Sequence, residues 1–180
     1  GGHFEEIIAR AKGEGIFIGI DQDEDAIERA KMRFADASVR LIRENFRSLG
    51  DIIRSEGLEK IDGIIFDLGI SSHQVDEADR GFSYMKDAPL DMRMDKRVKS
   101  GAWEAVNRLP EKDLKQIIKD YGEESWAGRI AEFICERRKH KSIDSTGELA
   151  EIVKEAIPAK FRRRGPHPAK RTFQAIRIYV

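Results

Sequence analysis

The first 67 residues alternate short apolar runs with helical apolar stripes, and this alternation restricts the possible folds more than any other feature. The runs that read as buried strands cover residues 16–20, 39–42 and 61–66. Between and before them, apolar residues recur at spacings of three and four, which is typical of amphipathic helices. These stripes cover residues 4–11, 26–34 and 49–53. Strands that alternate with helices predict a parallel, doubly wound α/β sheet.

The pattern changes after residue 80, where apolar residues follow helical spacing alone. Helices are expected over residues 103–109, 114–121 and 126–134. The sequence Ser145-Thr146-Gly147-Glu148 is a capping box, which predicts the start of a fourth helix that Pro158 ends. A last helix is expected to begin near Pro168, a favourable residue for a first turn. The second part of the chain is therefore expected to be a compact helical domain.

The composition indicates a soluble globular protein. A chain of 180 residues, 40% hydrophobic and 37% charged, suits one domain or one domain with a large insertion. No run approaches the roughly 20 apolar residues of a membrane span, so no membrane association is expected. The single cysteine, Cys135, excludes an internal disulfide framework and favours a cytoplasmic location. It lies within a helical pattern, where a packing role is favoured over catalysis.

Charge is distributed unevenly along the chain. Residues 156–180 contain seven basic residues and no acidic one. Because the whole chain has 33 basic and 33 acidic residues, the preceding part carries a net charge of −7. Such segregation is typical of proteins that bind a polyanion such as nucleic acid, although a solvated basic tail or a patch facing an acidic neighbour has the same composition.

A long polar stretch, residues 67–95, follows the third apolar run. In open α/β sheets, ligands bind beyond the carboxyl ends of the strands, and a long polar loop in that position usually serves chemistry or binding. This stretch has too few periodic apolar residues to be expected in a core. Its polar and glycine residues include Gly69, Ser71, Ser72, Gln74, Arg80, Gly81 and Arg93.

Asp21 is the strongest candidate for binding a cofactor. It ends the first expected strand about 20 residues after Gly1 and Gly2, where a carboxylate can accept hydrogen bonds from the two ribose hydroxyls of an adenosine group. Asp21 could instead cap the following helix, although Asp23 could do so equally well. Glycines followed by an acid serve both nicotinamide dinucleotides and S-adenosylmethionine, so a dehydrogenase remains an alternative to a methyltransferase at this point.

Two further residues follow strand ends. Phe46 comes after the second expected strand and could lie against an adenine face, or it could be a core residue. Asp67 ends the third, in the position where a methyltransferase places the group that faces its target amine. The four histidines, His3, His73, His140 and His167, have no spacing typical of metal ligands, so no metal is expected.

Several motifs together resemble the bacterial 16S ribosomal RNA cytosine-N4 methyltransferase family, also called MraW or RsmH. They are Gly1-Gly2-His3, Gly19-Ile20-Asp21-Gln22-Asp23, the D-L-G-I-S-S-x-Q, R-G-F-S and P-L-D-M-R-M-D segments of residues 67–95, and residues 167–177. The resemblance covers essentially the whole chain, and these segments in this order are highly specific. A missing initiator methionine and an end at Val180 within a helical pattern lead us to expect an internal fragment of a longer protein.

The resemblance implies a fold, a cofactor and a reaction. Residues 1–79 are expected to be part of a Rossmann-like S-adenosylmethionine-dependent methyltransferase sheet, and residues 80–180 an all-helical inserted domain that recognises RNA. The implied reaction methylates the exocyclic N4 amine of a cytidine in 16S ribosomal RNA of the small ribosomal subunit. The residues implied to bind the cofactor are Gly1, Gly2, His3, Asp21, Phe46, Asp67 and Gln74.

Two sets of roles are left open by the sequence. Asp67 is a candidate catalytic hydrogen-bond acceptor, a role that backbone carbonyls of residues 68–71 could also fill, or it could only position the cofactor. The candidates for RNA contact are Arg80, Arg93, Arg162, Arg163, Arg164, Lys170 and Arg171. For Arg80 and Arg93, an internal salt bridge to Asp91 or Asp95 is the alternative. A chain that kept its basic helical domain without a complete cofactor pocket would be an RNA-binding module rather than an enzyme.

Overall fold

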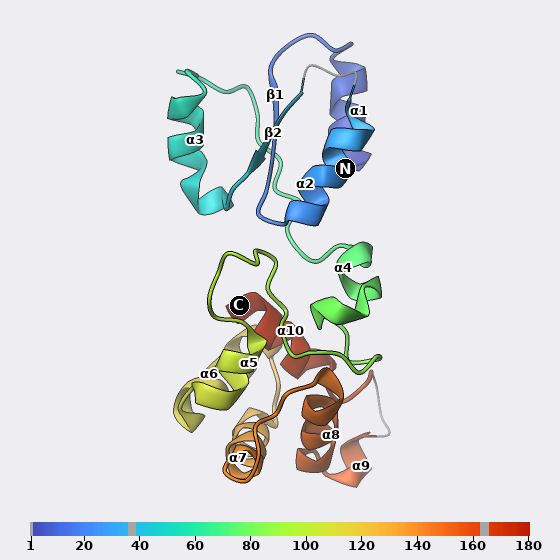
Figure 1. The fold of residues 1–180 in the computed structure, drawn as a ribbon, viewed down its shortest axis with the longest axis vertical. Coiled ribbons are helices and arrows are strands. Elements are labelled where there is room, and N and C mark those ends of the chain that lie inside the picture. The colour runs from blue at the N-terminus through green and yellow to red at the C-terminus, as the bar shows by residue number, and fades with distance from the viewer. Residues whose placement is uncertain (1, 36–38, 163–165) are drawn as a thin grey trace. The chain divides into compact units, whose positions relative to one another are not determined.

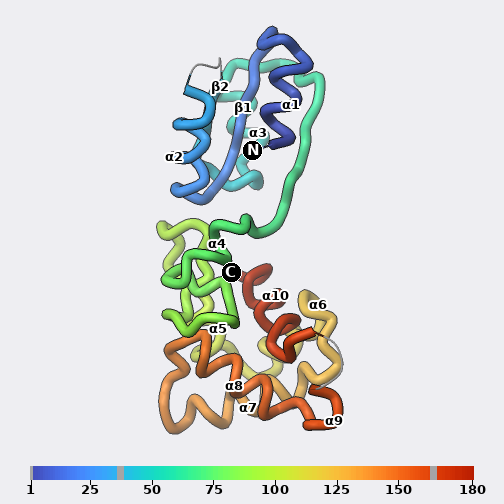
Figure 2. Tube along the Cα trace, turned by 90° about the vertical axis from the view of Figure 1, so that its right-hand side faces the viewer, coloured from blue at the N-terminus to red at the C-terminus, as the bar shows by residue number. Residues whose placement is uncertain are grey.

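A computed structural model describes residues 2–35, 39–162 and 166–180. The chain divides into two compact units (Figure 1, Figure 2). The first consists of Gly1–Asp67 and Met94–Lys96, and the second of Leu68–Arg93 and Arg97–Val180. The first unit holds a small parallel sheet, and the described part of the second is built from helices and loops. The expected mixture of parallel strands and helices is confirmed.

The first unit is built around two parallel strands, β1 (Phe17–Asp21) and β2 (Val39–Arg43). Their register pairs Phe17 with Val39 and Asp21 with Arg43, so both strands end at the same edge. Helices α1 (Gly2–Arg10) and α2 (Glu24–Arg33) lie on one side of the strands and α3 (Leu49–Ser55) on the other (Figure 1). A short 3₁₀ turn, η1 (Phe46–Ser48), leads into α3. Strands covered on both faces by helices are typical of a doubly wound arrangement.

Local sequence signals explain these elements. The Asp23 carboxylate accepts a hydrogen bond from the Asp25 backbone N–H at 3.1 Å and so caps the start of α2. Gly57 follows α3 with φ 70°, a left-handed conformation that favours glycine and ends the helix. Gly19 allows β1 to pack closely, because an added Cβ would lie 2.9 Å from a Leu41 methyl group and 3.5 Å from the Phe4 ring.

The third expected strand, residues 61–66, is not formed, and this prediction is wrong for the structure. The segment is extended without strand pairing, and the Ile65 and Phe66 side chains are 63% and 55% exposed. A strand needs a neighbour whose N–H and C=O groups complete its ladder. Within the described residues only β1 and β2 pair as strands, so residues 61–66 have an apolar strand composition without a paired neighbour.

The described part of the second unit begins with the short helix α4 and the 3₁₀ turn η2 and continues with six helices. They are α4 (Ser72–Asp76), η2 (Ala78–Arg80), α5 (Ala102–Arg108), α6 (Glu111–Gly122), α7 (Ala127–Arg138), α8 (Thr146–Ala156), α9 (Ala159–Arg162) and α10 (Lys170–Tyr179). The predicted capping box at Ser145 is confirmed: its hydroxyl accepts from the Glu148 N–H, and the Glu148 carboxylate accepts from the Ser145 N–H. Helix α10 packs against α6, and α7 lies between α6 and α8 (Figure 1).

The core of the second unit includes part of the polar stretch 67–95, which corrects the expectation that this stretch lies outside any core. Phe82, Leu90 and Met92 are at most 3% exposed. Residues 81–93 form a strap over the helices, held by hydrogen bonds from Leu90 N to Asp144 O and from Ala88 N to the Thr146 hydroxyl. The sequence pattern concealed this because the three apolar side chains follow no helical or strand period.

Candidate functional site

The carboxyl edge of the β1–β2 sheet brings two of the predicted cofactor residues together. Asp21 is the last residue of β1, and Phe46 begins the 3₁₀ turn that follows β2. Because the strands are parallel, both residues emerge at the same edge, where open α/β sheets bind ligands. The edge therefore carries a carboxylate and an aromatic ring on adjacent loops.

The structure separates the two roles considered for Asp21. The N-cap of α2 is Asp23, which is 2% exposed, whereas Asp21 is exposed at the sheet edge. Asp21 Oδ1 accepts a hydrogen bond from the Asp23 N–H at 2.9 Å. Partial desolvation raises the pKa of the Asp21 carboxyl, and this backbone hydrogen bond opposes the rise. Asp21 is therefore available as a hydrogen-bond acceptor for a ligand.

Phe46 is half exposed rather than a core residue. The residue is 49% exposed, and its ring packs edge to face against Phe66, with 6.2 Å between ring centroids. The aromatic pair lies within the first unit, on the loops that follow β2 and precede Asp67. A flat apolar ring with an accessible face is suited to contact an adenine.

His3 and Asp67 lie together although 64 residues separate them in the chain. The His3 Nδ1 atom is 3.3 Å from Asp67 Oδ2, and the two side chains are 77% and 70% exposed. His3 lies in the first turn of α1, which Gly2 begins, while Gly1 lies outside the described residues. The contact joins His3 and Asp67, two of the predicted cofactor residues, at the start of the polar stretch, where the carboxylate faces solvent.

Gln74 belongs to the second unit and has a local structural role. Its side-chain oxygen accepts from the Ser71 N–H at 2.9 Å, and the Ser71 hydroxyl accepts from the Gln74 N–H at 3.2 Å. This is a capping box for α4, and Gln74 is 5% exposed. The S-x-x-Q spacing is typical of such a box, which was not among the features predicted from the sequence. The cofactor role of Gln74 stays a prediction.

Two residues beside the predicted cofactor contacts, Gln22 and Asn45, were not among the residues predicted from the sequence. The Asn45 Nδ2 group donates to Gln22 Oε1 at 2.6 Å, which joins the loops that follow β1 and β2. Each is the chain neighbour of a predicted contact, Asp21 or Phe46. An asparagine before a short helical turn is a common N-cap and was the available signal for Asn45.

The arginines of the polar stretch make internal contacts. Arg93 Nε and Nη2 donate to the two carboxylate oxygens of Asp91 at 2.6 and 3.0 Å, which is the internal ion pair considered as an alternative. Burial raises the pKa of Asp91, but the hydrogen bonds and charge of Arg93 outweigh it, and the pKa is lowered overall. Arg80 is 6% exposed and donates to the Arg93 carbonyl. RNA contact by these two arginines stays a prediction.

The basic segment near the end of the chain is only partly described. Arg162 donates to the carbonyl oxygens of Ile157 and Glu155, at the end of α8. Arg171 donates to the Glu123 carbonyl at 3.0 Å, and Lys170 is exposed at the start of α10. Arg163 and Arg164 lie outside the described residues. Among the candidates that the structure describes, Lys170 is the one for which no hydrogen bond to a backbone carbonyl is seen.

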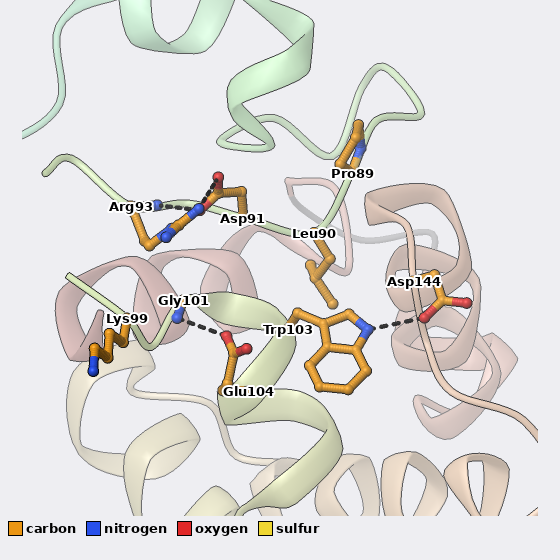
Figure 3. A pocket seen from close by; sticks show the side chains of 9 residues that line it. All are labelled: Pro89, Leu90, Asp91, Arg93, Lys99, Gly101, Trp103, Glu104 and Asp144. Atoms are coloured by element: carbon orange, nitrogen blue, oxygen red, sulfur yellow. Dashed lines mark hydrogen bonds and ion pairs between the residues drawn. The ribbon is translucent and has the colours of Figure 1, made fainter. Parts of the chain in front are cut away.

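The second unit contains a hollow of about 250 Å³ between the strap and α5. Figure 3 shows Leu90 above the Trp103 indole, whose Nε1 group donates to Asp144 at 2.8 Å. Glu104 accepts from the Gly101 N–H at 2.8 Å on the other side. The hollow therefore combines an aromatic wall with both signs of charge. Its lining residues are Pro89, Leu90, Asp91, Arg93, Lys99, Gly101, Trp103, Glu104 and Asp144.

The described residues show neither a cluster of metal ligands nor a membrane-spanning helix. Residues 2–35, 39–162 and 166–180 contain no cluster of three or more histidine, cysteine, aspartate or glutamate residues that could hold a metal ion. Over the same ranges, no helix is both long and apolar enough to span a bilayer.

Comparisons with known proteins give consistent matches. The model of the MraW methylase family matches residues 1–180. The ribosomal RNA small subunit methyltransferase H of Clostridioides difficile (strain 630) is 55% identical over 99% of this chain and 58% of its own length. The proteins of the same name from Clostridium botulinum (strain Kyoto / Type A2) and Heliobacterium modesticaldum are 53% and 50% identical over all of this chain and 58% of theirs.

The chain thus spans about three fifths of the length of the curated relatives that it matches. The matches include the sheet edge with Asp21 and Phe46, the polar stretch 67–95 and the basic segment, since they cover the chain from end to end. The chain belongs to the MraW methylase family.

Proposed function

We propose that the full-length protein transfers the methyl group of S-adenosylmethionine to the exocyclic N4 amine of a cytidine in 16S ribosomal RNA. Family membership supports this proposal, as do the relatives that are named ribosomal RNA small subunit methyltransferase H. The small ribosomal subunit or its RNA is the proposed partner. Because bacterial ribosomes are cytoplasmic, the same proposal places the protein in the cytoplasm.

We also propose that residues 1–79 are part of a Rossmann-like methyltransferase domain and that residues 80–180 are a helical domain inserted into it. The parallel β1–β2 pair with helices on both faces supports the first part. The helical packing of the second unit supports the other. The sheet of the full-length protein would then contain more strands than β1 and β2.

The single observation that most supports the proposed cofactor is that Asp21 and Phe46 lie at the same edge of the sheet. Adenosine presents two ribose hydroxyls, which need acceptors, and a flat base, which packs on an aromatic ring. The exposed Asp21 carboxylate and the half-exposed Phe46 ring have these properties. The residues present therefore fit an adenosine group. When bound, S-adenosylmethionine supplies an electrophilic methyl group on a sulfonium.

The target amine needs a hydrogen-bond acceptor, and a carboxylate can provide one. The N4 lone pair of cytosine is delocalised into the ring, so the amine is a weak nucleophile. Acceptors for its N–H bonds localise the lone pair and can take up the proton that methylation releases. Asp67 is the proposed acceptor: Oδ2 already contacts His3, and the side chain is 70% exposed. A cytosine must also be unstacked for its N4 to be reached.

The direct test uses the full-length protein, small ribosomal subunits or 16S RNA as substrate, and S-adenosylmethionine with a labelled methyl group. We expect label in the RNA, and nuclease digestion with mass spectrometry should identify N4-methylcytidine. Label at another position would contradict the proposed target. RNA binding without any transfer would favour a non-catalytic RNA-binding protein.

Replacing Asp21 with alanine should weaken S-adenosylmethionine binding by about 1–3 kcal/mol, because the ribose hydroxyls lose a charged acceptor. Calorimetry on the full-length protein measures this change. Asp21→Asn keeps an oxygen for the Asp23 N–H and should lose less. Asp51→Ala, which removes an exposed carboxylate from α3, is the matched control and should leave affinity unchanged. Equal affinity for Asp21→Ala and wild type would exclude the ribose role.

Reversing the charge of Lys170 should weaken RNA binding similarly for all RNA sequences, because phosphate contacts carry no sequence information. For Lys170→Glu, the slope of log K against log salt should become shallower by about one. Lys154→Glu is the control, because Lys154 is paired with Glu151 on α8 outside the basic segment. A salt slope that is the same for Lys170→Glu and wild type would mean that Lys170 faces away from RNA.

A further inference from the structure

Three segments of the first unit meet at the Gln22 side chain. They are the loop after β1, the loop after β2, and the Met94–Lys96 segment, which returns to this unit from the polar stretch. Gln22 Oε1 accepts from Asn45 Nδ2 at 2.6 Å, and Gln22 Nε2 donates to the Met94 sulfur at 3.3 Å. Both ends of the carboxamide are therefore engaged, each by a different segment.

The orientation of these amides follows from the backbone. Asn45 Oδ1 accepts from the Arg47 N–H at 2.9 Å and so caps η1. With Asn45 Oδ1 directed at the backbone, the NH₂ group of Asn45 is the end that reaches Gln22, and the Gln22 oxygen accepts from it. The Gln22 NH₂ group is then directed to Met94, whose thioether is a weak acceptor. The side chains form one ordered chain of donors and acceptors from the start of η1 to Met94.

An ion-pair chain reinforces the same junction. Arg43, the last residue of β2, contacts Glu24 at 2.8 Å and Asp95 at 3.5 Å. The Arg43 and Asp95 side chains are 24% and 11% exposed, so solvent screens this contact less than it would a surface pair. Met94 and Asp95 are therefore held on the sheet edge through both Gln22 and Arg43.

The position of Gln22 gives this junction a consequence for binding. Gln22 follows Asp21, and its partner Asn45 precedes Phe46. Ribose and adenine are covalently joined, so a carboxylate and a ring that bind them must be held at a matching separation. If the two loops were mobile in the free protein, binding would have to order them, and this entropic cost would lower the affinity for the ligand.

We propose that Gln22 is a positioning residue for the adenosine part of the cofactor site. Its carboxamide ties the loop that carries Asp21 to the loop that carries Phe46 and sets their separation before the ligand binds. This inference rests on the proposed function, in which Asp21 meets the ribose and Phe46 the adenine. Gln22 itself need not touch the ligand.

The test is a double-substitution cycle in the full-length protein, with S-adenosylhomocysteine as the ligand in calorimetry so that no turnover is needed. Gln22→Met keeps the length of the side chain and removes both amide hydrogen bonds. It should weaken binding about 5–30-fold, because the two loops must then be ordered as the ligand binds. Gln116→Met, at an exposed glutamine on α6, is the matched control and should change affinity less than about twofold.

The coupling between the two loops separates positioning from a general loss of stability. In a Phe46→Ala background there is no ring to hold in register, so Gln22→Met should weaken binding less than about threefold. Hydrogen exchange in the ligand-free protein should also accelerate at residues 44–48 when Gln22 is replaced. An equal loss in both backgrounds, or affinity within twofold of wild type for Gln22→Met alone, would overturn the proposal.

A second variant covers the case in which Gln22→Met does not fold. Asn45→Ser keeps a capping oxygen for η1 and removes the donor that reaches Gln22. It should reproduce the affinity loss and its dependence on Phe46, and failure to do so would overturn the proposal. The proposed function has a separate criterion: if the wild-type protein binds no S-adenosylhomocysteine, the cofactor assignment fails. If Asp21→Ala weakens binding but Gln22→Met and Asn45→Ser do not, only the positioning role fails.

Discussion

Asp67→Ala is expected to lower kcat for RNA methylation about 10²–10⁴-fold, the range over which a positioned acid or base contributes to catalysis. The amine must lose a proton as it gains a methyl group, and a carboxylate is a suitable acceptor for its N–H bonds. In the structure Asp67 follows the apolar segment 61–66, faces solvent and makes a polar contact with the His3 ring. Its second oxygen has no hydrogen-bond partner within the described chain.

Steady-state measurements on the full-length protein can separate the two roles considered for Asp67. A catalytic acceptor lowers kcat at saturating S-adenosylmethionine, whereas a residue that only holds the cofactor raises KM and leaves kcat near wild type. Asp67→Asn retains a hydrogen-bonding oxygen without the charge and should fall between alanine and wild type. A kcat for Asp67→Ala within threefold of wild type at saturating cofactor would exclude catalysis by this carboxylate.

His3→Ala is the matched control for this experiment. It removes the contact to Asp67 Oδ2 and leaves the carboxylate in place. We expect a smaller loss of kcat than for Asp67→Ala, because the acceptor survives and loses only one of its orienting partners. A larger loss for His3→Ala would instead identify the imidazole as the group that acts on the amine.

The elements that could be predicted from sequence are those whose signals lie within a few consecutive residues. Strands β1 and β2 and helix α8 follow from apolar runs and from the Ser145 capping box, because hydrogen bonds inside a segment or between nearby segments decide them. Residues 61–66 have an equally good strand composition, yet the segment lacks a paired neighbour within the described residues. A strand depends on its partner, so its own composition cannot guarantee it.

The same distinction applies to the candidate site. Asp21 and Phe46 could be placed at the sheet edge because Asp21 ends one strand and Phe46 follows the end of the other. The Gln22–Asn45 bridge could not, because it depends on how two loops approach one another, and no residue pattern encodes a distance of 2.6 Å between side chains. The burial of Phe82 and Met92 was equally hidden, since neither takes part in a periodic pattern.

Gly81, in the R-G-F-S segment, has a backbone conformation and close contacts that the motif alone does not reveal. It ends η2 in a left-handed conformation with φ 68°, where an L side chain is strained. An alanine Cβ would collide with the Pro89 carbonyl oxygen and lie 2.9 Å from the Asp91 amide nitrogen. The later part of the strap, which carries Leu90 and Met92 into the core, therefore crosses directly over this glycine, at which the strap begins.

Gly81→Ala is accordingly expected to destabilise the second unit by about 2–5 kcal/mol. The left-handed backbone accounts for about 1–2 kcal/mol, and displacement of packed groups for about 1–3 kcal/mol. The displacement is costly because the strap is also held at Asp144 and Thr146, so it cannot move without breaking hydrogen bonds to the start of α8. Urea unfolding of the full-length protein, followed by fluorescence, measures this through Trp103 and Trp126, which both lie in the second unit.

Two other glycines provide controls that separate the backbone strain from the collision. Gly57 has φ 70°, and no atom lies within 4 Å of an added Cβ. Gly57→Ala should therefore lower the free energy of unfolding only by the cost of the left-handed backbone, about 1–2 kcal/mol. Gly128 lies in α7, where a Cβ would meet the Lys115 side chain at an ordinary 3.5 Å. Gly128→Ala should therefore stabilise by up to about 1 kcal/mol through helix propensity. Hydrogen exchange measured peptide by peptide reports the stability of each unit separately. If Gly81→Ala loses no more stability than Gly57→Ala, the strap has moved to accommodate the added methyl group.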